Sequence, residues 1–284
     1  MAERAEQDEL LDEAARLKAL PGFPAAVRQY IVGMAQFRQS PRLVNKLVSY
    51  DARWRVVGYL LYLHADRERF GPEGGATYSA LLEICIARRE VSPRVLKTML
   101  ALLQVTGFIQ ARRNSEDRRS KFYSPTERMH RFVKLWLTCA VGALDLLEPA
   151  MQRTMMLERD KGFADRFLVS GGRDHLIGTP PADRMPEFIG FFGAREGASA
   201  VTLVVMLADI DGTAVPSRAV IAKRFGLSKT QVSNVMAAGE ELGYFALDAA
   251  AAPAATQHLR ETFAKWISIE LAFYAQHMQP ASDG

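Results

Sequence analysis

The chain has 284 residues, of which 49% are hydrophobic and 24% charged, and its formal net charge is +4. These values are typical of a folded globular protein and exclude collagen-like, mucin-like and wholly disordered chains. The longest apolar stretch falls short of the roughly 20 residues of a membrane span, and the acidic N-terminus does not resemble a secretory signal. Only two cysteines are present. We therefore expect a cytoplasmic protein with no membrane partner and no disulfide scaffold.

The first half of the chain is predicted to be helical up to a single β-hairpin. Pro21 and Gly22 end the first helix, which places Leu10, Ala14 and Leu17 on one face. Helices are predicted over residues 3–20, 24–38, 41–50, 54–63, 77–88 and 92–105, with a glycine-rich loop at 71–75 and a hairpin made of 108–113 and 118–123 around the polar tip 114–117.

A long helix, a linker and a second half are predicted to follow. A capping box at Ser124–Glu127, with proline at the first helical position, begins the long helix, and Pro149 kinks or ends it. Residues 170–186 contain two adjacent glycines and several prolines, which predicts a linker between the halves. The last helix is predicted to begin at Thr256 and to carry an apolar face made of Leu259, Phe263, Trp266, Ile267, Leu271 and Tyr274.

The two halves repeat each other at a spacing of 136 residues. Ser92 precedes Gly107 by 15 residues, and Ser228 precedes Gly243 by the same number. We expect each serine to cap a helix by accepting a hydrogen bond from its first turn. The apolar residues that follow at matching positions are Leu96, Met99 and Leu100 in the first copy and Val232, Val235 and Met236 in the second. The order of helix, tight turn, helix, glycine and hairpin is that of a winged helix-turn-helix, so two such modules are predicted.

Basic residues are concentrated in the first copy. Between Ser79 and Lys134 the sequence holds twelve Lys and Arg against five Asp and Glu, an excess larger than that of the whole chain. The exposed face of each second helix carries side chains that can contact base edges and phosphates in a major groove. The predicted DNA-binding residues are Ser92, Pro93, Arg94, Lys97, Thr98, Arg112, Arg113, Asp117, Arg118, Arg119 and Lys121 in the first copy, and Ser228, Lys229, Thr230, Gln231, Ser233 and Asn234 in the second.

Residues 91–109, the Asp117–Arg119 segment and Thr126 carry a resemblance to a known family. They resemble the MarR family of bacterial regulators, and the resemblance covers roughly residues 54–135. In that family an Asp-x-Arg pair in the wing is followed by a threonine that begins the next helix. The resemblance implies that Asp117 orients a nearby arginine, while the hairpin presents its basic residues to a minor groove or to its phosphates.

The second copy departs from this pattern. Its hairpin region, residues 245–250, has no basic residue and no Asp-x-Arg pair, and Gly239 stands where the first copy has Leu103. Contact between this copy and DNA is therefore an open question. MarR-like chains dimerise through terminal helices to place two heads on adjacent major grooves. Here one chain contains two heads, so it either mimics such a dimer or forms a homodimer through its own terminal helices.

These patterns predict a mainly α-helical protein with small β-wings, in which two tandem winged helix-turn-helix domains are joined and flanked by long helices. The predicted function is transcription regulation through binding of double-stranded DNA. A tandem winged-helix replication initiator and a winged-helix scaffold for protein interactions are the alternatives.

No reaction, cofactor or metal is predicted, since the five histidines lack metal-ligand spacing, and no effector is identified. The predicted parts are N-terminal helices (1–50), the first winged helix (51–128), a connecting helix and linker (129–186), the second winged helix (187–250) and a C-terminal helix (251–284).

Overall fold

The computed structural model describes residues 2–39, 51–113, 121–177, 181–249 and 252–280. Over these residues the chain is mainly helical and has two antiparallel two-stranded sheets, which confirms the predicted fold class at this level. Its helices are α1 (Ala2–Ala19), α2 (Phe23–Phe37), α4 (Asp51–Ala65), α5 (Arg67–Phe70), α6 (Tyr78–Ala87), α7 (Pro93–Val105), α8 (Glu127–Leu147), α9 (Arg153–Arg159), α10 (Phe163–Ile177), α11 (Pro186–Phe192), α12 (Ala198–Asp211), α13 (Arg218–Phe225), α14 (Lys229–Glu241) and α15 (Gln257–His277). Its strands are β1 (Ile109–Arg113), β2 (Lys121–Pro125), β3 (Phe245–Leu247) and β4 (Pro253–Ala255), and 3₁₀ turns occupy Pro149–Met151 and Pro181–Arg184.

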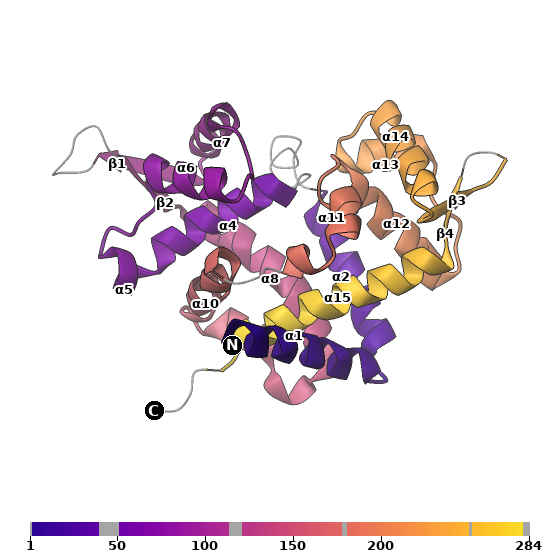
Figure 1. The fold of residues 1–284 in the computed structure, drawn as a ribbon, viewed down its shortest axis with the longest axis horizontal. Coiled ribbons are helices and arrows are strands. Elements are labelled where there is room, and N and C mark those ends of the chain that lie inside the picture. Colours follow the sequence, from indigo (N-terminus) through magenta and orange to yellow (C-terminus); the bar gives the residue numbers. More distant parts are fainter. Residues whose placement is uncertain (1, 40–50, 114–120, 178–180, 250–251, 281–284) are drawn as a thin grey trace.

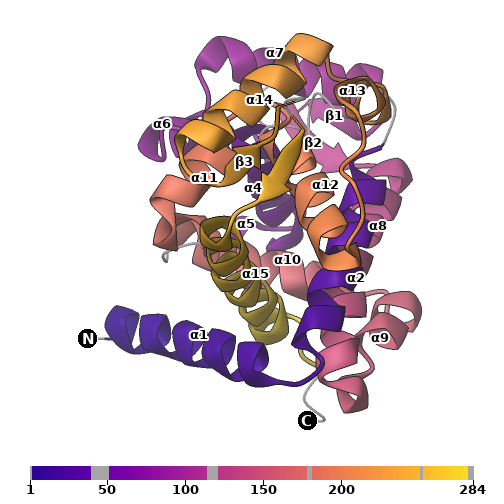
Figure 2. The ribbon, with the colours of Figure 1, turned by 90° about the vertical axis from the view of Figure 1, so that its right-hand side faces the viewer.

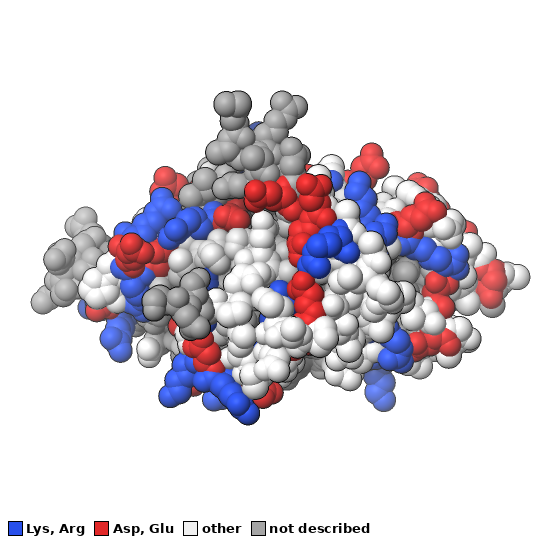
Figure 3. Space-filling view, turned by 90° about the horizontal axis from the view of Figure 1, so that it is seen from below, with Lys and Arg blue, Asp and Glu red and all other residues white. Residues whose placement is uncertain are grey.

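Helices α7 and α14 lie on the same side of the molecule, one in each half (Figure 1). The β1–β2 hairpin is at one end of the molecule beside α6, and the β3–β4 hairpin is at the other end beside α14. The view turned by 90° again places α7 and α14 together at one edge, with α1 and α15 below them (Figure 2). The side opposite to α7 and α14 has uncharged areas on both sides of a central band of Asp, Glu, Lys and Arg (Figure 3).

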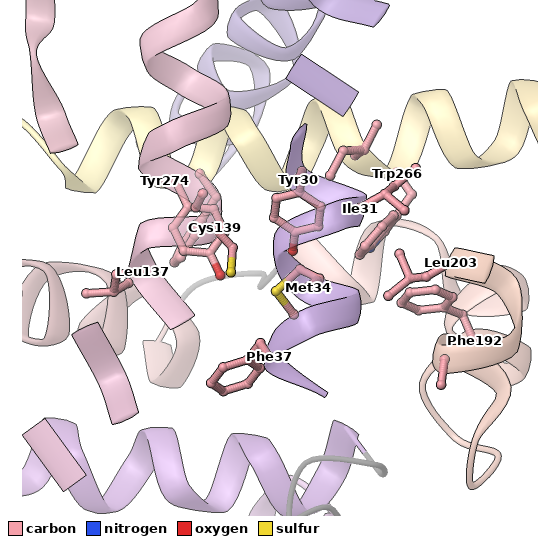
Figure 4. Close-up of a cluster of buried hydrophobic side chains, with 14 of the residues drawn as sticks. Tyr30, Ile31, Met34, Phe37, Leu137, Cys139, Phe192, Leu203, Trp266 and Tyr274 are labelled. Carbon is pink, nitrogen blue, oxygen red and sulfur yellow. The ribbon is translucent and has the colours of Figure 1, made fainter. Parts of the chain in front are cut away.

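Helix α2 runs through the centre and joins the two halves. Its buried residues recur every three or four positions, so that one broad face is apolar. This helix packs along α8 and against α12, while α1 packs along α15. Tyr30 and Met34 of α2 lie among side chains from α8, α12 and α15 (Figure 4). The hydrophobic core is therefore continuous across both halves.

Most of the predicted helices are confirmed within a few residues. Leu10, Ala14 and Leu17 of α1 are buried, and so is the predicted apolar face of α15. Helix α8 ends at Leu147, before Pro149, as expected for a proline that cannot continue a helix. The predicted helix at 41–50 lies outside the described residues. Among the described helices, none combines the length and the apolar character that crossing a membrane requires.

The predicted capping box at Ser124–Glu127 is wrong. Ser124 and Pro125 belong to strand β2, where they pair with Gln110 and Ile109. Thr126 is the residue that precedes the first turn of α8, and its hydroxyl does not cap that turn. The hairpin thus extends two residues farther than the local sequence pattern indicates, because pairing across the strands satisfies the backbone hydrogen-bonding groups of this segment.

The predicted linker at 170–186 is wrong for its first part. Gly171 and Gly172 lie inside α10. A Cβ atom at Gly172 would lie 2.6 Å from Tyr62 Cβ in α4, and one at Gly171 would lie 3.2 Å from a ring carbon of Phe273 in α15. The two glycines therefore allow α10 to approach α4 and α15 closely. Residues 178–180 lie outside the described residues. A 3₁₀ turn begins at Pro181, and α11 follows it at Pro186.

Candidate nucleic-acid interface

Helices α7 and α14 have the same length and the same kind of start. Each has 13 residues, and their first residues, Pro93 and Lys229, are 136 positions apart. The hydroxyl of Ser92 accepts a hydrogen bond from the first turn of α7, and the hydroxyl of Ser228 accepts one from the first turn of α14. Both predicted N-caps are confirmed. After each helix a glycine adopts a positive φ, 71° at Gly107 and 73° at Gly243, which turns the chain into the hairpin.

The buried and exposed faces of α7 are those predicted. Its inner face consists of Leu96, Met99, Leu100 and Leu103, all buried. The exposed residues of its first two turns, with the cap, are Ser92, Pro93, Arg94, Lys97 and Thr98. The ammonium of Lys97 lies 5.5 Å from the centre of the Tyr78 ring in α6, so a ring contact holds this side chain near the helix surface.

Helix α14 presents fewer freely exposed polar side chains than predicted. Lys229, Thr230 and Asn234 are exposed. Gln231 is half-buried, and its side-chain oxygen accepts a hydrogen bond from the backbone N–H of Ser228 at 2.8 Å, which completes a capping box. Ser233 is also half-buried and accepts a hydrogen bond from Arg218. The side chains of Gln231 and Ser233 therefore take part in the internal structure of this half.

The first hairpin carries a cluster of positive charge. Arg113 pairs directly with Lys121 across the strands, and both side chains are exposed, as is that of Arg112. Two like charges placed opposite each other are unfavourable for the hairpin itself. The predicted residues Asp117, Arg118 and Arg119 lie outside the described residues.

The second hairpin carries no such charge. Strands β3 and β4 contain no Lys or Arg, and their pairs are Phe245 with Ala255 and Leu247 with Pro253. The absence of basic residues from this hairpin was expected from the sequence. The two hairpins therefore occupy equivalent positions in the repeat but differ in charge.

A threonine joins the following long helix to each unit; both helix starts were predicted from the sequence, but the two threonines were not recognised as equivalent. The hydroxyl of Thr126 donates to the carbonyl oxygens of Gly107 and Phe108, at 2.7 and 3.0 Å. That of Thr256 donates to the carbonyl oxygens of Gly243 and Tyr244, at 2.7 and 3.1 Å. Thr126 and Thr256 begin helices α8 and α15, each of 21 residues. The spacing of 130 residues, six fewer than the main repeat, is the signal that identifies Thr256 as the equivalent residue.

Several basic side chains of α7, α14 and the described strands of the first hairpin form no ion pair with another described residue. Arginines elsewhere form ion pairs, such as Arg28 with Asp211 and Arg260 with Asp209. Within the described residues, no ion pair involves Arg94, Lys97, Arg112, Arg113, Lys121 or Lys229. Helix α7 contains no acidic residue, and the acids of α14, Glu240 and Glu241, lie in its last turn. The charge is thus available to an anionic partner.

The cysteines and the possible metal ligands of the described residues form no reactive thiol and no metal site. Cys85 in α6 and Cys139 in α8 are free and buried. Burial raises the pKa of each thiol to about 11, so both stay protonated and unreactive at neutral pH. Over the same residues, no group of three or more His, Cys, Asp or Glu side chains is arranged to hold a metal ion.

No family model, curated protein or solved structure matches the chain. Its own geometry combines an exposed helix start, which carries hydrogen-bonding side chains, with hairpin strands whose described basic residues are exposed. That combination suits a polyanion whose surface offers both phosphates and base edges.

Proposed function

We propose that the chain is a DNA-binding transcriptional regulator with two tandem winged helix-turn-helix modules, the first of them MarR-like. The observation that carries this proposal is the placement of α7 and α14 on one side of a single core (Figure 1). A duplex running along that side meets the exposed first turns of both helices. The exposed basic residues of α7 and of strands β1 and β2 lie in the same half, where they stabilise the complex by neutralising phosphates.

Each element has a distinct role in this proposal. Helix α7 enters a major groove with its first turn, so that Arg94 contacts base edges and Ser92 and Thr98 contact phosphates. The first hairpin lies along the backbone and brings Arg112 and Arg113 to phosphates. Helix α14 contributes through Lys229, Thr230 and Asn234, without help from a basic wing. Such a division gives most of the non-specific affinity to the first module.

Gel shift against genomic fragments over a series of salt concentrations tests the proposal. The logarithm of the binding constant falls with the logarithm of salt concentration by about 0.9 for each phosphate neutralised on B-DNA. Several basic groups contact phosphates here, so we expect a steep slope of several units. A flat salt response would favour a scaffold for protein interactions, and binding confined to fragments from a replication origin would favour a replication initiator.

Single arginine variants separate base contacts from phosphate contacts. We expect Arg94→Ala to cost about 1–3 kcal/mol of binding and to relax preference at one base pair, while Arg113→Ala weakens all sequences evenly. Arg28→Ala is the matched control, because it removes one positive charge from α2 that is already paired with Asp211. Equal losses from Arg94→Ala and Arg28→Ala would mean that net charge alone matters, and the base-reading role of Arg94 would have to be abandoned.

A further inference from the structure

The turn between α6 and α7 contains an arginine in a backbone conformation that favours glycine. Arg89 has a φ of 53°, which lies in the left-handed region. The backbone N–H of the next residue, Glu90, donates a hydrogen bond at 2.9 Å to the carbonyl oxygen of Cys85, five residues back. This hydrogen bond ends α6 in the Schellman arrangement, in which the left-handed residue is usually glycine. Any residue with a Cβ atom is strained at this position.

Four other helix ends in the described part of the chain have the same arrangement, and each of them has glycine at this position. In each, the next residue donates its backbone N–H to the carbonyl oxygen five residues back. The φ angles of these glycines lie between 62° and 73°, and the residues are Gly107, Gly212, Gly226 and Gly243. Gly226 is the direct counterpart of Arg89, since it stands between α13 and α14. The first copy therefore has a strained arginine where the second copy has an unstrained glycine.

The side chain of Arg89 makes no contact within the described structure that offsets this strain. It is exposed, and it forms no ion pair with another described residue. The adjacent Arg88, by contrast, pairs with Asp183 at 3.3 Å. Strained backbone conformations are concentrated at binding sites and other functional positions. The conformation of Arg89 thus indicates a role outside the fold.

The residue after Arg89 holds the turn in place. The carboxylate of Glu90 accepts hydrogen bonds from the guanidinium of Arg55 at 2.8 and 2.7 Å, and one from the hydroxyl of Tyr59 at 2.8 Å. Both partners belong to α4, and the Glu90 side chain is only 5% exposed. A strained conformation persists where the surrounding structure determines it. The contacts of Glu90 with α4 provide this support for Arg89.

Arg89 lies close to the start of α7. It precedes the capping residue Ser92 by three positions and Arg94 by five. The proposed function places the first turn of α7 in a major groove. A side chain from the turn just before that helix lies nearer to the rim of the groove than to its floor, and phosphates form the rim. The guanidinium of arginine can bind a phosphate through two parallel hydrogen bonds.

We propose that Arg89 is a further DNA-contacting residue, which binds a phosphate at the edge of the major groove that α7 enters. This assignment rests on the proposed function. The second copy lacks the contact because Gly226 has no side chain. Arginine at this position lowers the stability of the fold and raises its affinity for DNA, relative to glycine.

Replacing Arg89 in the full-length protein should therefore change stability and DNA affinity in opposite directions. We expect Arg89→Gly to raise the midpoint of unfolding in denaturant, because glycine adopts the left-handed conformation without strain. In a gel-shift series over salt, we expect the slope of the logarithm of the binding constant to become shallower by about 0.9, the value for one phosphate. Arg89→Lys keeps both the charge and the strain, so it should retain the wild-type slope and midpoint.

Arg159→Ala is the control for net charge. Arg159 is an exposed residue of α9, which lies at the opposite end of the molecule from α7 and α14 (Figure 2). We expect this variant to keep the wild-type salt slope. An equal change of slope in Arg89→Gly and Arg159→Ala would assign the effect to net charge and overturn the proposal.

The remaining outcomes separate this assignment from the proposed function. A steep wild-type slope that Arg89→Gly leaves unchanged would overturn the assignment of Arg89 alone. A lower unfolding midpoint for Arg89→Gly would show that the arginine serves the fold, and the argument from strain would fail. Absence of DNA binding by the wild-type protein at low salt would overturn the proposed function and this assignment with it.

Discussion

The two repeats exchange large and small side chains at a pair of positions. Leu103 in α7 corresponds to Gly239 in α14, and Ile109 corresponds to Phe245, at the same spacing of 136 residues. A Cβ atom at Gly239 would lie 2.3 Å from the ring of Phe245. The larger ring in the second half thus occupies the space that a leucine side chain fills in the first. The departure of Gly239 from the first copy is explained by packing.

The same substitution should have opposite effects at two helix-interior glycines. We expect Gly239→Ala to lower the free energy of unfolding by about 1–3 kcal/mol, because the added methyl group collides with a buried ring. Gly58→Ala in α4 should raise it by about 0.5–1 kcal/mol, because alanine favours the helix and a Cβ atom at Gly58 would meet no atom within 4 Å. Unfolding in denaturant measures both. A second change, Phe245→Ile, should offset part of the loss from Gly239→Ala; stabilisation by Gly239→Ala alone would contradict the packing argument.

His64 makes stability depend on pH in the acid range. Its pKa is lowered from 6.5 to about 4, first by burial and then by the charge of Arg67, whose guanidinium lies 2.7 Å from the His64 Nε2. Between these values the unfolded state binds more protons than the folded state, so the free energy of unfolding falls as pH falls from 6.5 towards 4.

Replacing His64 removes this contribution. We expect His64→Gln to lose less stability than the wild type between pH 7 and pH 5, since glutamine does not titrate. Denaturant midpoints at the two pH values measure the difference, and the carboxylates common to both proteins cancel in the comparison. An identical pH dependence in the two proteins would show that His64 titrates normally in the folded state.

At the scale of elements, one hydroxyl group sets the joint between α7 or α14 and the long helix that follows its hairpin. Thr126 and Thr256 make matching hydrogen bonds to the glycine turn. Thr256 alone also caps its helix, by accepting a hydrogen bond from Leu259 N–H at 3.1 Å. The second joint therefore depends on its threonine more than the first.

Alanine variants of the two threonines measure this difference. We expect Thr126→Ala to cost about 1 kcal/mol of stability for the lost hydrogen bonds. Thr256→Ala should cost about 2 kcal/mol, since a helix cap is lost as well. Thr126→Ser and Thr256→Ser keep the hydroxyl and are the controls. Equal losses at the two positions would mean that the cap at Thr256 adds nothing.

Elements defined by local patterns could be predicted from the sequence, and those defined by distant contacts could not. The starts of α7 and α14 follow from a capping serine and the apolar residues after it, which are all local. The place of Gly172 inside α10 depends on Tyr62, more than 100 residues away, and no composition rule distinguishes it from a loop glycine. In the candidate site, the exposure of Arg94 and Lys97 follows from periodicity. The capping role of Gln231 corresponds to a local pattern, Ser-x-x-Gln, in the sequence. The contact of Ser233 with Arg218 corresponds to no local pattern.

At the scale of the whole molecule, the continuous core fixes the two heads relative to each other. Helix α2 packs against α8 and α12, so both halves share one hydrophobic interior. A single chain can therefore present α7 and α14 on one side without a second copy. The heads are nevertheless unlike, because Arg94 corresponds to Thr230 and Lys97 to Ser233. If the chain binds DNA as proposed, the unlike pair Arg94 and Thr230 is expected to contact unlike base pairs.

The preferred DNA site should thus be non-palindromic and should bind one chain. Selection from a random duplex library, followed by mass measurement of the complex, determines both properties. We expect two different half-sites about 10 base pairs apart, one helical turn, so that α7 and α14 meet adjacent major grooves on one side of the duplex. A palindromic site occupied by two chains would mean that the protein acts as a homodimer.

Changing the spacing of the half-sites tests the rigidity of the core. An insertion of about 5 base pairs turns the second half-site to the far side of the duplex. An insertion of about 10 base pairs returns it to the same side as the first half-site but leaves the two half-sites farther apart. Because one core carries both heads, either insertion should remove the contribution of α14 and weaken binding about tenfold or more. Lys229→Ala with Asn234→Ala should then have little further effect on the altered sites, while it weakens binding to the original site. If the 10-base-pair insertion left affinity unchanged, the two heads would have to move independently, which a shared core does not allow.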